Sequence, residues 1–318
     1  MPRILLIKTS SLGDVVHNLP VVADIVAALP DVTIDWVVEE AFAGIPRLHP
    51  RVSRVLPVAV RRWRRALWHP AVWGEIRAFF GHLRDQSYDA VIDSQGLLKS
   101  AWIAGVARGV SHGLDRASSR EPLGLFYDHR HPVPWGQHAV ERNRQLAAQA
   151  LGYTVSAPVQ YGISAAAQTF AWLDNRRPHA VLLHATSADR KLWPEERWIA
   201  LGQALAAQGI SSVLPWGTAA EHERSLRLMQ KIPQAVVPER LDIAALAALL
   251  AQARVVVGTD TGLTHLAGAL GVPTVGIYCA TDPAATGLYA CARGVNLGGV
   301  GKAPVVGEVV AAVKSVIK

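Results

Sequence analysis

The chain has 318 residues with a formal net charge of +7, and half of its residues are hydrophobic, enough for two buried cores of about 150 residues each. No apolar run reaches the ~18 residues of a membrane span, and the first residues lack the long apolar stretch of a signal peptide. The two cysteines form neither a disulfide framework nor a metal-binding pattern, so we expect a reduced, cytoplasmic setting.

The first half of the sequence alternates apolar runs with helical stretches. Ile4 to Ile7 is continuously apolar, as expected of a strand buried on both faces. The predicted strands lie near 3–8, 33–38, 53–57, 89–93 and 109–113, and the predicted helices near 14–29, 71–86, 97–107 and 137–151. Glycines and prolines interrupt the pattern over 152–178, which predicts a connector.

The second half repeats the alternation. The predicted strands lie near 180–184, 211–215, 235–236, 254–258 and 273–278, and the predicted helices near 194–208, 219–231, 242–252, 263–270 and 305–318. Alternating units of this kind predict an α/β protein with parallel, doubly wound sheets. We therefore expect two Rossmann-like domains, 1–155 and 175–304, with ligands at the carboxyl ends of their strands.

A polar loop follows the first predicted strand and carries a carboxylate. Between strand and helix the sequence reads Lys8-Thr9-Ser10-Ser11-Leu12-Gly13-Asp14. Aspartate is a favourable N-cap, so one interpretation of Asp14 is purely structural. The other is a functional carboxylate, because the carboxyl ends of strands in open α/β sheets are where ligands bind.

A second strand–loop–helix–strand unit spans 253–277. Its loop ends in Asp260-Thr261-Gly262, and a helix of small residues follows. Free backbone amides and the helix dipole favour anions at such a start. The Thr261 and Thr264 hydroxyls can add donors, and Asp260 can accept from sugar hydroxyls or cap the helix. A well-capped turn without a ligand is the alternative.

Eight segments, in order along nearly the whole chain, resemble the lipopolysaccharide heptosyltransferases of glycosyltransferase family 9, and within that family the heptosyltransferase I group. The two signatures are 8–14 and 260–265. The other segments are Trp36-Val37-Val38-Glu39-Glu40, Arg61-Arg62-Trp63-Arg64-Arg65, Asp93-Ser94-Gln95-Gly96-Leu97, Ser119-Arg120-Glu121-Pro122, His184-Ala185-Thr186-Ser187 and Pro215-Trp216-Gly217. The resemblance implies a GT-B fold, in which two facing Rossmann-like domains leave a cleft, with the helix 305–318 as a candidate to cross back to the first domain.

The resemblance also implies a reaction. L-glycero-D-manno-heptose would move from ADP-L-glycero-D-manno-heptose to O5 of the first Kdo of Kdo2-lipid A, with inversion, in lipopolysaccharide inner-core synthesis. Asp14 would deprotonate the acceptor hydroxyl, and Lys191 would stabilise the leaving ADP. We expect no cofactor and no metal, because Asp260 stands in Thr-Asp-Thr-Gly and not in an Asp-X-Asp pair. Such an enzyme would work peripherally on the cytoplasmic face of the inner membrane of a Gram-negative bacterium.

The donor site is expected in the second domain. Its candidate residues are Thr186, Ser187, Lys191, Glu221, Leu241, Asp260, Thr261, Gly262 and His265. Three of them have plain alternatives: Arg190 can take the place of Lys191, Glu221 suits the first turn of a helix, and His265 can be a buried helix histidine.

The acceptor site is expected in the first domain, where Arg47 to Arg84 holds nine arginines and a single acid, Glu75, interleaved with tryptophans. A solvated basic face is one interpretation. Nucleic acid is disfavoured because no helix-turn-helix, RNP or OB pattern is present. An anionic membrane and an acidic acceptor both suit arginine, and Kdo2-lipid A combines the two. The candidate acceptor-binding residues are Ser10, Ser11, Gly13, Arg61, Arg62, Arg64, Arg65 and Arg120.

Two departures from the family pattern matter. Thr186-Ser187 stands where Thr-Thr is usual, and Cys279 stands where glycine is expected, so the shape of the donor pocket there is open. Two other hypotheses remain. One is a later heptosyltransferase of the family or another GT-B sugar-nucleotide enzyme, such as an epimerase or hydrolase. The other is a non-catalytic basic module for membranes or nucleic acid, which leaves the loops at 8–14 and 258–265 unexplained.

Overall fold

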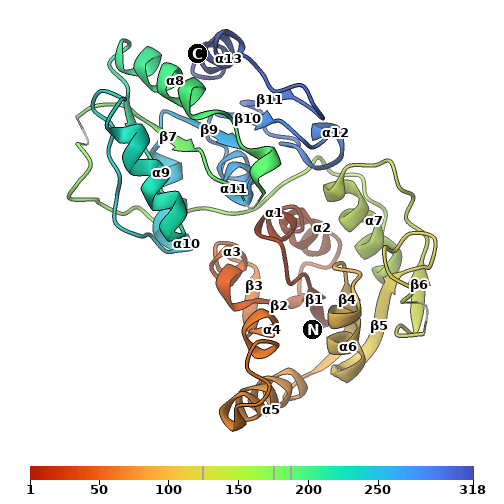
Figure 1. Ribbon diagram of the computed structural model, residues 1–318. Coiled ribbons are helices and arrows are strands. Elements are labelled where there is room, and N and C mark those ends of the chain that lie inside the picture. The colour runs from red at the N-terminus through yellow and green to blue at the C-terminus, as the bar shows by residue number, and fades with distance from the viewer. Residues whose placement is uncertain (124, 175, 187) are drawn as a thin grey trace. The chain divides into compact units, whose positions relative to one another are not determined.

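The computed structural model describes residues 1–123, 125–174, 176–186 and 188–318. The chain divides into two compact units, Met1–Ile163 and Ser164–Lys318. Figure 1 shows that each unit is built on its own sheet with helices packed around it. All strand pairings within the two sheets are parallel, so the predicted α/β architecture is confirmed.

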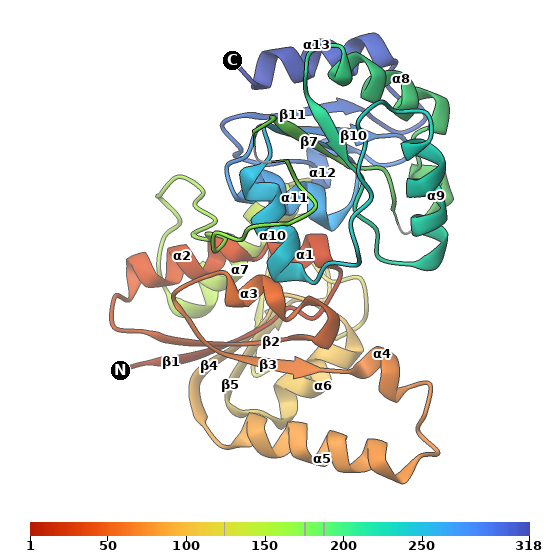
Figure 2. The same cartoon turned by 90° about the vertical axis from the view of Figure 1, so that its left-hand side faces the viewer.

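The first unit contains a six-stranded sheet in the order β3-β2-β1-β4-β5-β6. Its strands are β1 (Arg3–Ile7), β2 (Thr33–Glu39), β3 (Val52–Val58), β4 (Ser87–Asp93), β5 (Arg108–Leu114) and β6 (His129–His131). Figure 2 shows α2 (Leu19–Ala28), α3 (Gly44–Arg47) and α7 (Ala139–Leu151) on one face of this sheet, and α5 (Pro70–Arg84) and α6 (Leu98–Val106) on the other. The short helix α4 (Val60–Trp63) joins the apolar core on the α5 side.

The second unit contains a five-stranded sheet in the order β11-β10-β9-β7-β8. Its strands are β7 (His179–Leu183), β8 (Ser211–Val213), β9 (Val255–Thr259), β10 (Thr274–Tyr278) and β11 (Gly294–Gly298). Its helices are α8 (Glu195–Ala206), α9 (Ala219–Met229), α10 (Ile243–Gln252), α11 (Gly262–Ala269), α12 (Pro283–Thr286) and α13 (Val306–Val316). Val309, Val313 and Val316 of α13 lie in the core of this sheet with Leu201 and Leu205 of α8. The last helix therefore belongs to the second unit and does not cross back.

The predicted helix at 14–29 is wrong in one respect, because it consists of two helices. The chain forms α1 (Leu12–Val16), turns at His17 and Asn18, and restarts as α2 with Pro20 in its first turn. Proline has no N–H to donate and its ring clashes with the carbonyl four residues earlier, so a continuous helix through Pro20 is disfavoured.

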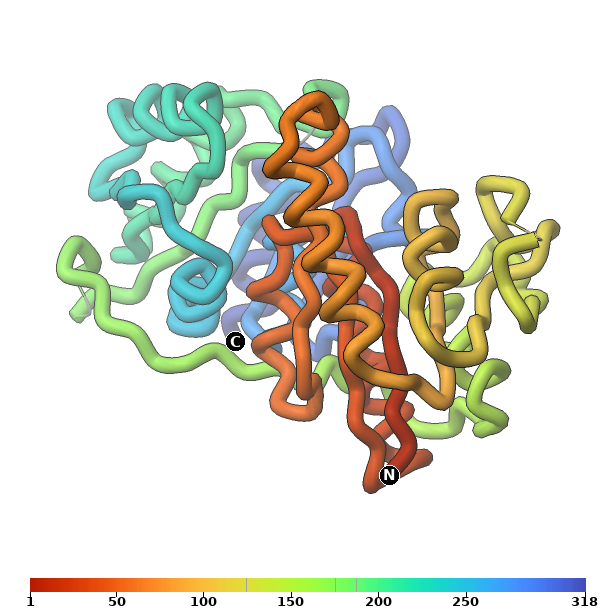
Figure 3. The backbone as a smooth tube through the Cα atoms, turned by 90° about the horizontal axis from the view of Figure 1, so that it is seen from below, coloured from red at the N-terminus to blue at the C-terminus, as the bar shows by residue number. Residues whose placement is uncertain are grey.

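Other differences concern short elements. Residues 235–236 form no strand, and Val236 makes an isolated bridge to Val213. The edge strands β6 and β11 and the short helices α3, α4 and α12 were not predicted. Their sequences, such as His-Arg-His in β6, are too short or too polar to show a hydrophobic period. The predicted connector is confirmed in part: residues 153–170, all described, form neither helix nor strand, and Figure 3 traces them as an extended segment.

A buried ion pair ties α7 to α2 in the first unit. The Arg144 guanidinium donates to both carboxylate oxygens of Asp24, at 2.7 and 2.9 Å, and also to the Ala157 carbonyl at 2.7 Å. We expect Arg144→Met to lower the free energy of unfolding by about 3–5 kcal/mol, because it leaves the Asp24 carboxylate buried without its partner. Urea unfolding followed by fluorescence measures this. The double variant Asp24→Leu/Arg144→Met should recover part of the loss, and an unchanged midpoint in the single variant would contradict the argument.

Candidate functional site

The strand order of the first sheet reverses between β1 and β4: β2 and β3 lie on one side of β1, and β4 to β6 lie on the other. Loops at the carboxyl ends of such neighbouring strands diverge and leave room for a ligand. Here Gln95, which follows β4, bonds to the loop after β1: its Oε1 accepts from the backbone amides of Thr9 and Ser10, each at 2.9 Å. Gln95 thereby positions the loop that leads to Asp14.

Asp14 lies in the first turn of α1, half-buried, and one carboxylate oxygen serves the helix start. Oδ2 accepts from the Ser11 backbone amide at 2.7 Å and from the Ser11 hydroxyl at 2.9 Å. The prediction that Asp14 is the N-cap is therefore wrong, because Ser11 is the N-cap and Asp14, at the third helical position, completes a capping box with Oδ2. Oδ1 takes no part in these bonds, so the same arrangement fixes the carboxylate and leaves an oxygen to receive a proton.

A buried lysine, Lys8, begins this loop. Lys8 is 7% exposed, and its ammonium donates to the Ser94 carbonyl at 2.7 Å. Burial lowers the pKa of Lys8, the charges of Asp14 and Asp93 oppose this, and the charges of Arg142 and Arg120 add to it. The charge of Lys8 therefore interacts with two carboxylates and two arginines. Arg120 was predicted here, whereas Lys8 and Arg142 were missed as functional candidates.

The arginine cluster is not uniformly available. Arg62 pairs with Glu40 through two bonds of 3.0 and 3.1 Å and with Glu75 at 2.8 Å, so its charge is neutralised within the unit. Arg62 stays a predicted acceptor contact, but these two acids would have to release it before it could bind an anion. Arg61 lies over the Phe42 ring at 5.3 Å, and its amide donates to Glu39. Arg61, Arg64, Arg65 and Arg120 are exposed.

Ser10, Ser11 and Gly13 lie in or next to the loop after β1. The Ser10 hydroxyl accepts from the Lys99 ammonium at 3.0 Å. Burial lowers the pKa of Lys99, the charge of Glu39 raises it, and the charges of Arg61 and Arg64 lower it further. Lys99 therefore interacts both with the arginine cluster and with the loop of Asp14. Lys99 was also missed by sequence reasoning.

The strand order of the second sheet reverses between β7 and β9. The Thr186 hydroxyl, after β7, donates to the Asp260 carbonyl, after β9, at 3.2 Å. The Asp260 carboxylate is 8% exposed and gathers three partners. They are the Lys191 ammonium at 2.7 Å, the Thr281 hydroxyl at 2.7 Å and the His265 ring at 3.4 Å.

This network changes the predicted role of Asp260. Burial raises the pKa of its carboxyl, but hydrogen bonds from its three partners outweigh burial and hold that pKa below the ordinary value. Asp260 therefore stays charged and fixes the position of Lys191. The predicted neighbours Thr186, Lys191, Asp260 and His265 are brought together, and Thr281 was missed.

The start of α11 is open. Thr261 is its N-cap in extended conformation, and its side chain does not cap the helix. The amides of Gly262 and Leu263 have no acceptor within the helix, whereas those of Thr264 and His265 donate to the Thr261 carbonyl. Thr264 is wrong as a ligand donor, because its hydroxyl is buried and donates to the Thr259 carbonyl at 2.7 Å. A Cβ on Gly258 would lie 2.1 Å from that hydroxyl, so glycine permits α11 to pack this closely.

The remaining donor candidates are less decisive. Glu221 Oε2 accepts from the Gly217 amide at 2.7 Å and the Thr218 amide at 3.2 Å, so this oxygen caps α9. Leu241 is half-buried before α10. Ser187 lies outside the described residues. Cys279 is a half-buried free thiol that packs against the core of the second sheet.

His184 begins the predicted donor segment but is structural. It is fully buried, and its Nε2 lies 2.8 Å from the Ser225 hydroxyl. Burial lowers the pKa of His184 to about 4, and the charge of Arg224 adds to the effect. The folded protein keeps His184 neutral, whereas the unfolded chain protonates near its ordinary pKa of about 6.5.

Stability should therefore fall as the pH drops from 6.5 to 4, because the unfolded state binds the proton first. We expect the His184 contribution to reach about 2 kcal/mol between pH 7 and pH 5. Urea titrations at both pH values measure it, with His184→Gln as the comparison, since glutamine does not titrate. An equal pH dependence in the two proteins would contradict this assignment.

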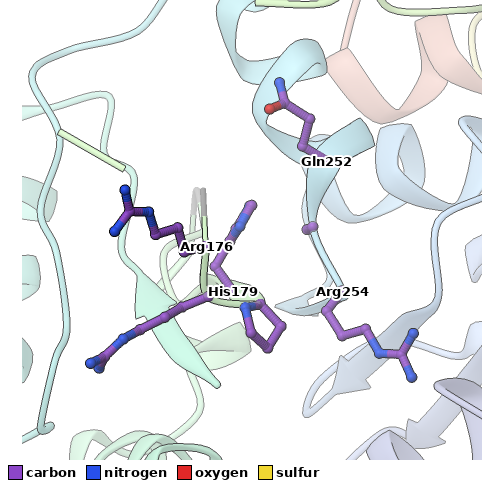
Figure 4. A pocket seen from close by; sticks show the side chains of 7 residues that line it. Arg176, His179, Gln252 and Arg254 are labelled. Carbon is purple, nitrogen blue, oxygen red and sulfur yellow. The ribbon is translucent and has the colours of Figure 1, made fainter. Parts of the chain in front are cut away.

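A separate hollow of about 520 Å³ opens at the amino ends of β7 and β9, away from the Asp260 loop. It is lined by Arg176, Arg177, Pro178, His179, Gln252, Ala253 and Arg254. Figure 4 shows the guanidinium groups of Arg176 and Arg254 pointing away from each other, so they do not converge on one ligand. The predicted donor residues do not line it.

Comparison with known proteins identifies the family of the chain. Residues 76–311 match the model of glycosyltransferase family 9 (heptosyltransferase). The chain is 50% identical to lipopolysaccharide heptosyltransferase 1 of Pseudomonas aeruginosa over 299 residues, 93% of this chain and 83% of that protein. It matches the structure of E. coli heptosyltransferase WaaC with ADP at a TM-score of 0.90 and 41% identity, over 99% of each chain. It matches the WaaC structure with ADP-2-deoxy-2-fluoro heptose at 0.84 and 41% identity, over 99% and 98%.

The chain therefore belongs to glycosyltransferase family 9. It is a glycosyltransferase of the GT-B type, as the resemblance in its sequence implied. Among the described residues, no helix is long and apolar enough to cross a bilayer.

Proposed function

We propose that the chain is a lipopolysaccharide heptosyltransferase that moves L-glycero-D-manno-heptose from ADP-heptose to O5 of the first Kdo of Kdo2-lipid A. The observation that carries the proposal is the Asp14 carboxylate, held by Ser11 at the switch point of the first sheet and close enough to the buried Lys8 for their charges to interact. A carboxylate base with a cation nearby suits an acceptor that offers a hydroxyl next to its own carboxylate. The names of the similar proteins support the same substrates.

The reaction follows from these groups. Asp14 takes the proton of the acceptor hydroxyl while that oxygen attacks the anomeric carbon of the heptose. The bond from that carbon to the ADP phosphate breaks, and ADP leaves with the bonding electrons. Attack from the face opposite ADP inverts the configuration. No covalent sugar–enzyme intermediate is needed, so one carboxylate suffices.

The donor side supplies positive charge for the leaving group. Lys191, fixed by Asp260, and the amides of Gly262 and Leu263 would face the diphosphate, where negative charge grows in the transition state. Thr186 and Thr261 add hydroxyls, Glu221 Oε1 can accept from the ribose, and Leu241 borders the adenine. The Asp260 carboxylate is already bonded to three partners. We therefore propose that Lys191 and backbone amides, and not a metal ion, stabilise the charge of the leaving diphosphate.

We also propose that the protein works as a peripheral protein on the cytoplasmic face of the inner membrane. Arg64, Arg65 and the exposed Trp68 on the α4–α5 segment suit an anionic lipid surface. Sedimentation with vesicles that contain 30% anionic lipid should capture the protein, and purely zwitterionic vesicles should not. Equal capture by both would contradict this.

Release of ADP from ADP-heptose tests the function, with and without deacylated Kdo2-lipid A and in the presence of EDTA. We expect release that depends on the acceptor and survives EDTA. Loss of activity in EDTA, restored by Mg²⁺, would overturn metal independence. ADP-heptose binding without turnover on this acceptor would point to a later heptosyltransferase.

A further inference from the structure

The side-chain amide of Gln95 has a fixed orientation. Gln95 follows β4, and β4 lies beside β1 in the sheet (Figure 1). Its Oε1 accepts from the Thr9 amide at 2.9 Å, the Ser10 amide at 2.9 Å and the Thr9 hydroxyl at 3.3 Å. A side-chain amide accepts hydrogen bonds through its oxygen and donates them through its nitrogen. The two backbone amides therefore fix Oε1 on the loop after β1 and place Nε2 on the other branch of the side chain.

The backbone of Gln95 is fixed as well. Asp93 is fully buried, and its Oδ1 accepts from the Gln95 amide at 2.9 Å and from the Gly96 amide at 3.2 Å. Its Oδ2 accepts from the Tyr127 hydroxyl at 2.7 Å. Gly96 has a φ of +64°, which glycine adopts without strain, so the chain can turn directly after Gln95. Because its backbone and its oxygen are both held, Gln95 would lose little conformational entropy on binding a ligand.

The Nε2 group of Gln95 has no partner among the described residues. The side chain is half-buried, and Nε2 is not one of the buried atoms that lack a partner, so solvent reaches it. The serine hydroxyls of the loop are already engaged, since that of Ser10 accepts from Lys99 and that of Ser11 donates to Asp14. Hydrogen bonds to Oε1 polarise the amide and make its N–H groups stronger donors. Gln95 thus offers an oriented, accessible donor beside the loop of the proposed base.

We propose that Gln95 contacts the acceptor, with Nε2 donating to an oxygen of its acidic sugar while Oε1 holds the loop that leads to Asp14. The inference rests on the proposed function, because it assigns the contact to the acceptor of that reaction. Gln95 and Asp14 follow β4 and β1, the two strands that flank the switch point where open α/β sheets bind ligands. A carboxylate or ring oxygen only accepts hydrogen bonds, and an amide donates to it without adding a further cation that would make Asp14 a weaker base.

Gln95→Glu separates the two ends of the side chain. The variant keeps an oxygen for the Thr9 and Ser10 amides but replaces the donor with a negatively charged oxygen. Initial rates with deacylated Kdo2-lipid A at about pH 8, where carboxyl groups are ionised, measure the effect. We expect the acceptor KM to rise by about tenfold or more, with kcat and the KM of ADP-heptose within about threefold of wild type.

A second variant and a control distinguish a contact from a change of field. Gln95→Met loses both the donor and the oxygen, so its acceptor KM should rise and its kcat should also fall by about tenfold, because the loop loses its anchor. Leu98→Glu adds a carboxylate at a position that is 48% exposed and three residues further on, and should leave the acceptor KM within about twofold of wild type. In about 0.5 M NaCl the increase in Gln95→Glu should persist, whereas a long-range repulsion would be screened.

The outcomes separate this inference from the proposed function. Transfer by the wild type together with an unchanged acceptor KM in Gln95→Glu would overturn the contact and leave the function intact. The same holds if salt abolishes the increase, or if the KM of ADP-heptose rises in place of the acceptor KM. If Gln95→Glu fails to fold, the acceptor KM of Gln95→Met decides in the same way. No transfer by the wild type would overturn the proposed function, and with it the ligand assigned to Nε2.

Discussion

Asp14→Asn is expected to lower kcat for heptose transfer by about 10²- to 10⁴-fold. Asparagine is almost the same size and can keep a hydrogen bond to the Ser11 hydroxyl, but it cannot take the proton of the attacking hydroxyl. The proposed ADP site is on the other sheet, so the affinity for ADP should change by less than about twofold. Initial rates with saturating ADP-heptose and isothermal titration with ADP measure the two quantities.

The matched control is Asp31→Asn, which removes an exposed carboxylate from the same unit. It should transfer heptose at the wild-type rate. Ser11→Ala removes one of the two bonds that fix Asp14 Oδ2, and an intermediate loss is expected because the carboxylate keeps its chemistry but loses orientation. If Asp14→Asn retained more than a tenth of the activity, Asp14 would be only the N-terminal acid of α1, and the base would have to be sought elsewhere.

The two site loops could be predicted because each depends on local pattern. A continuous apolar strand followed by a polar turn and a helix appears in the sequence at Ile4–Ile7 and again at Val255–Thr259. In a parallel sheet such turns lie at the carboxyl ends of the strands. The strand order reverses next to β1 in the first sheet and next to β9 in the second, so both turns lie where ligands bind. The sequence therefore placed Asp14, Thr186 and Asp260 correctly at these edges, and their roles stay predictions.

The residues that were missed make contacts between segments far apart in the chain. Gln95 holds a loop 85 and 86 residues earlier, and Arg142 reaches the cations around Lys8 from α7. Such partners depend on tertiary packing, which no short window contains. The same limit explains Arg62: its neighbours in sequence are basic, but its ion-pair partners Glu40 and Glu75 come from other turns of the fold.

Lys191→Ala is expected to lower kcat by about 10²- to 10³-fold, with a smaller effect on ADP-heptose binding, because the charge on the leaving diphosphate grows only as its bond to the sugar breaks. Lys191→Arg should restore part of the rate, since it keeps the charge with a different geometry. Arg190→Ala, which removes the exposed neighbouring cation, is the matched control and should retain nearly full activity. A large loss in that control together with a mild one at Lys191 would mean that Arg190 faces the phosphates.

Asp260 makes this prediction sharper, because it contacts Lys191 at 2.7 Å. If the carboxylate serves to position the ammonium, Asp260→Asn should lower kcat less than Lys191→Ala does. The double variant should then be no slower than Lys191→Ala alone, since Asp260 has no further part to play once the ammonium is gone. Losses that multiply would instead mean that Asp260 contacts the donor in its own right. The double-mutant cycle thus decides whether Lys191 and Asp260 are coupled in the reaction or contribute independently.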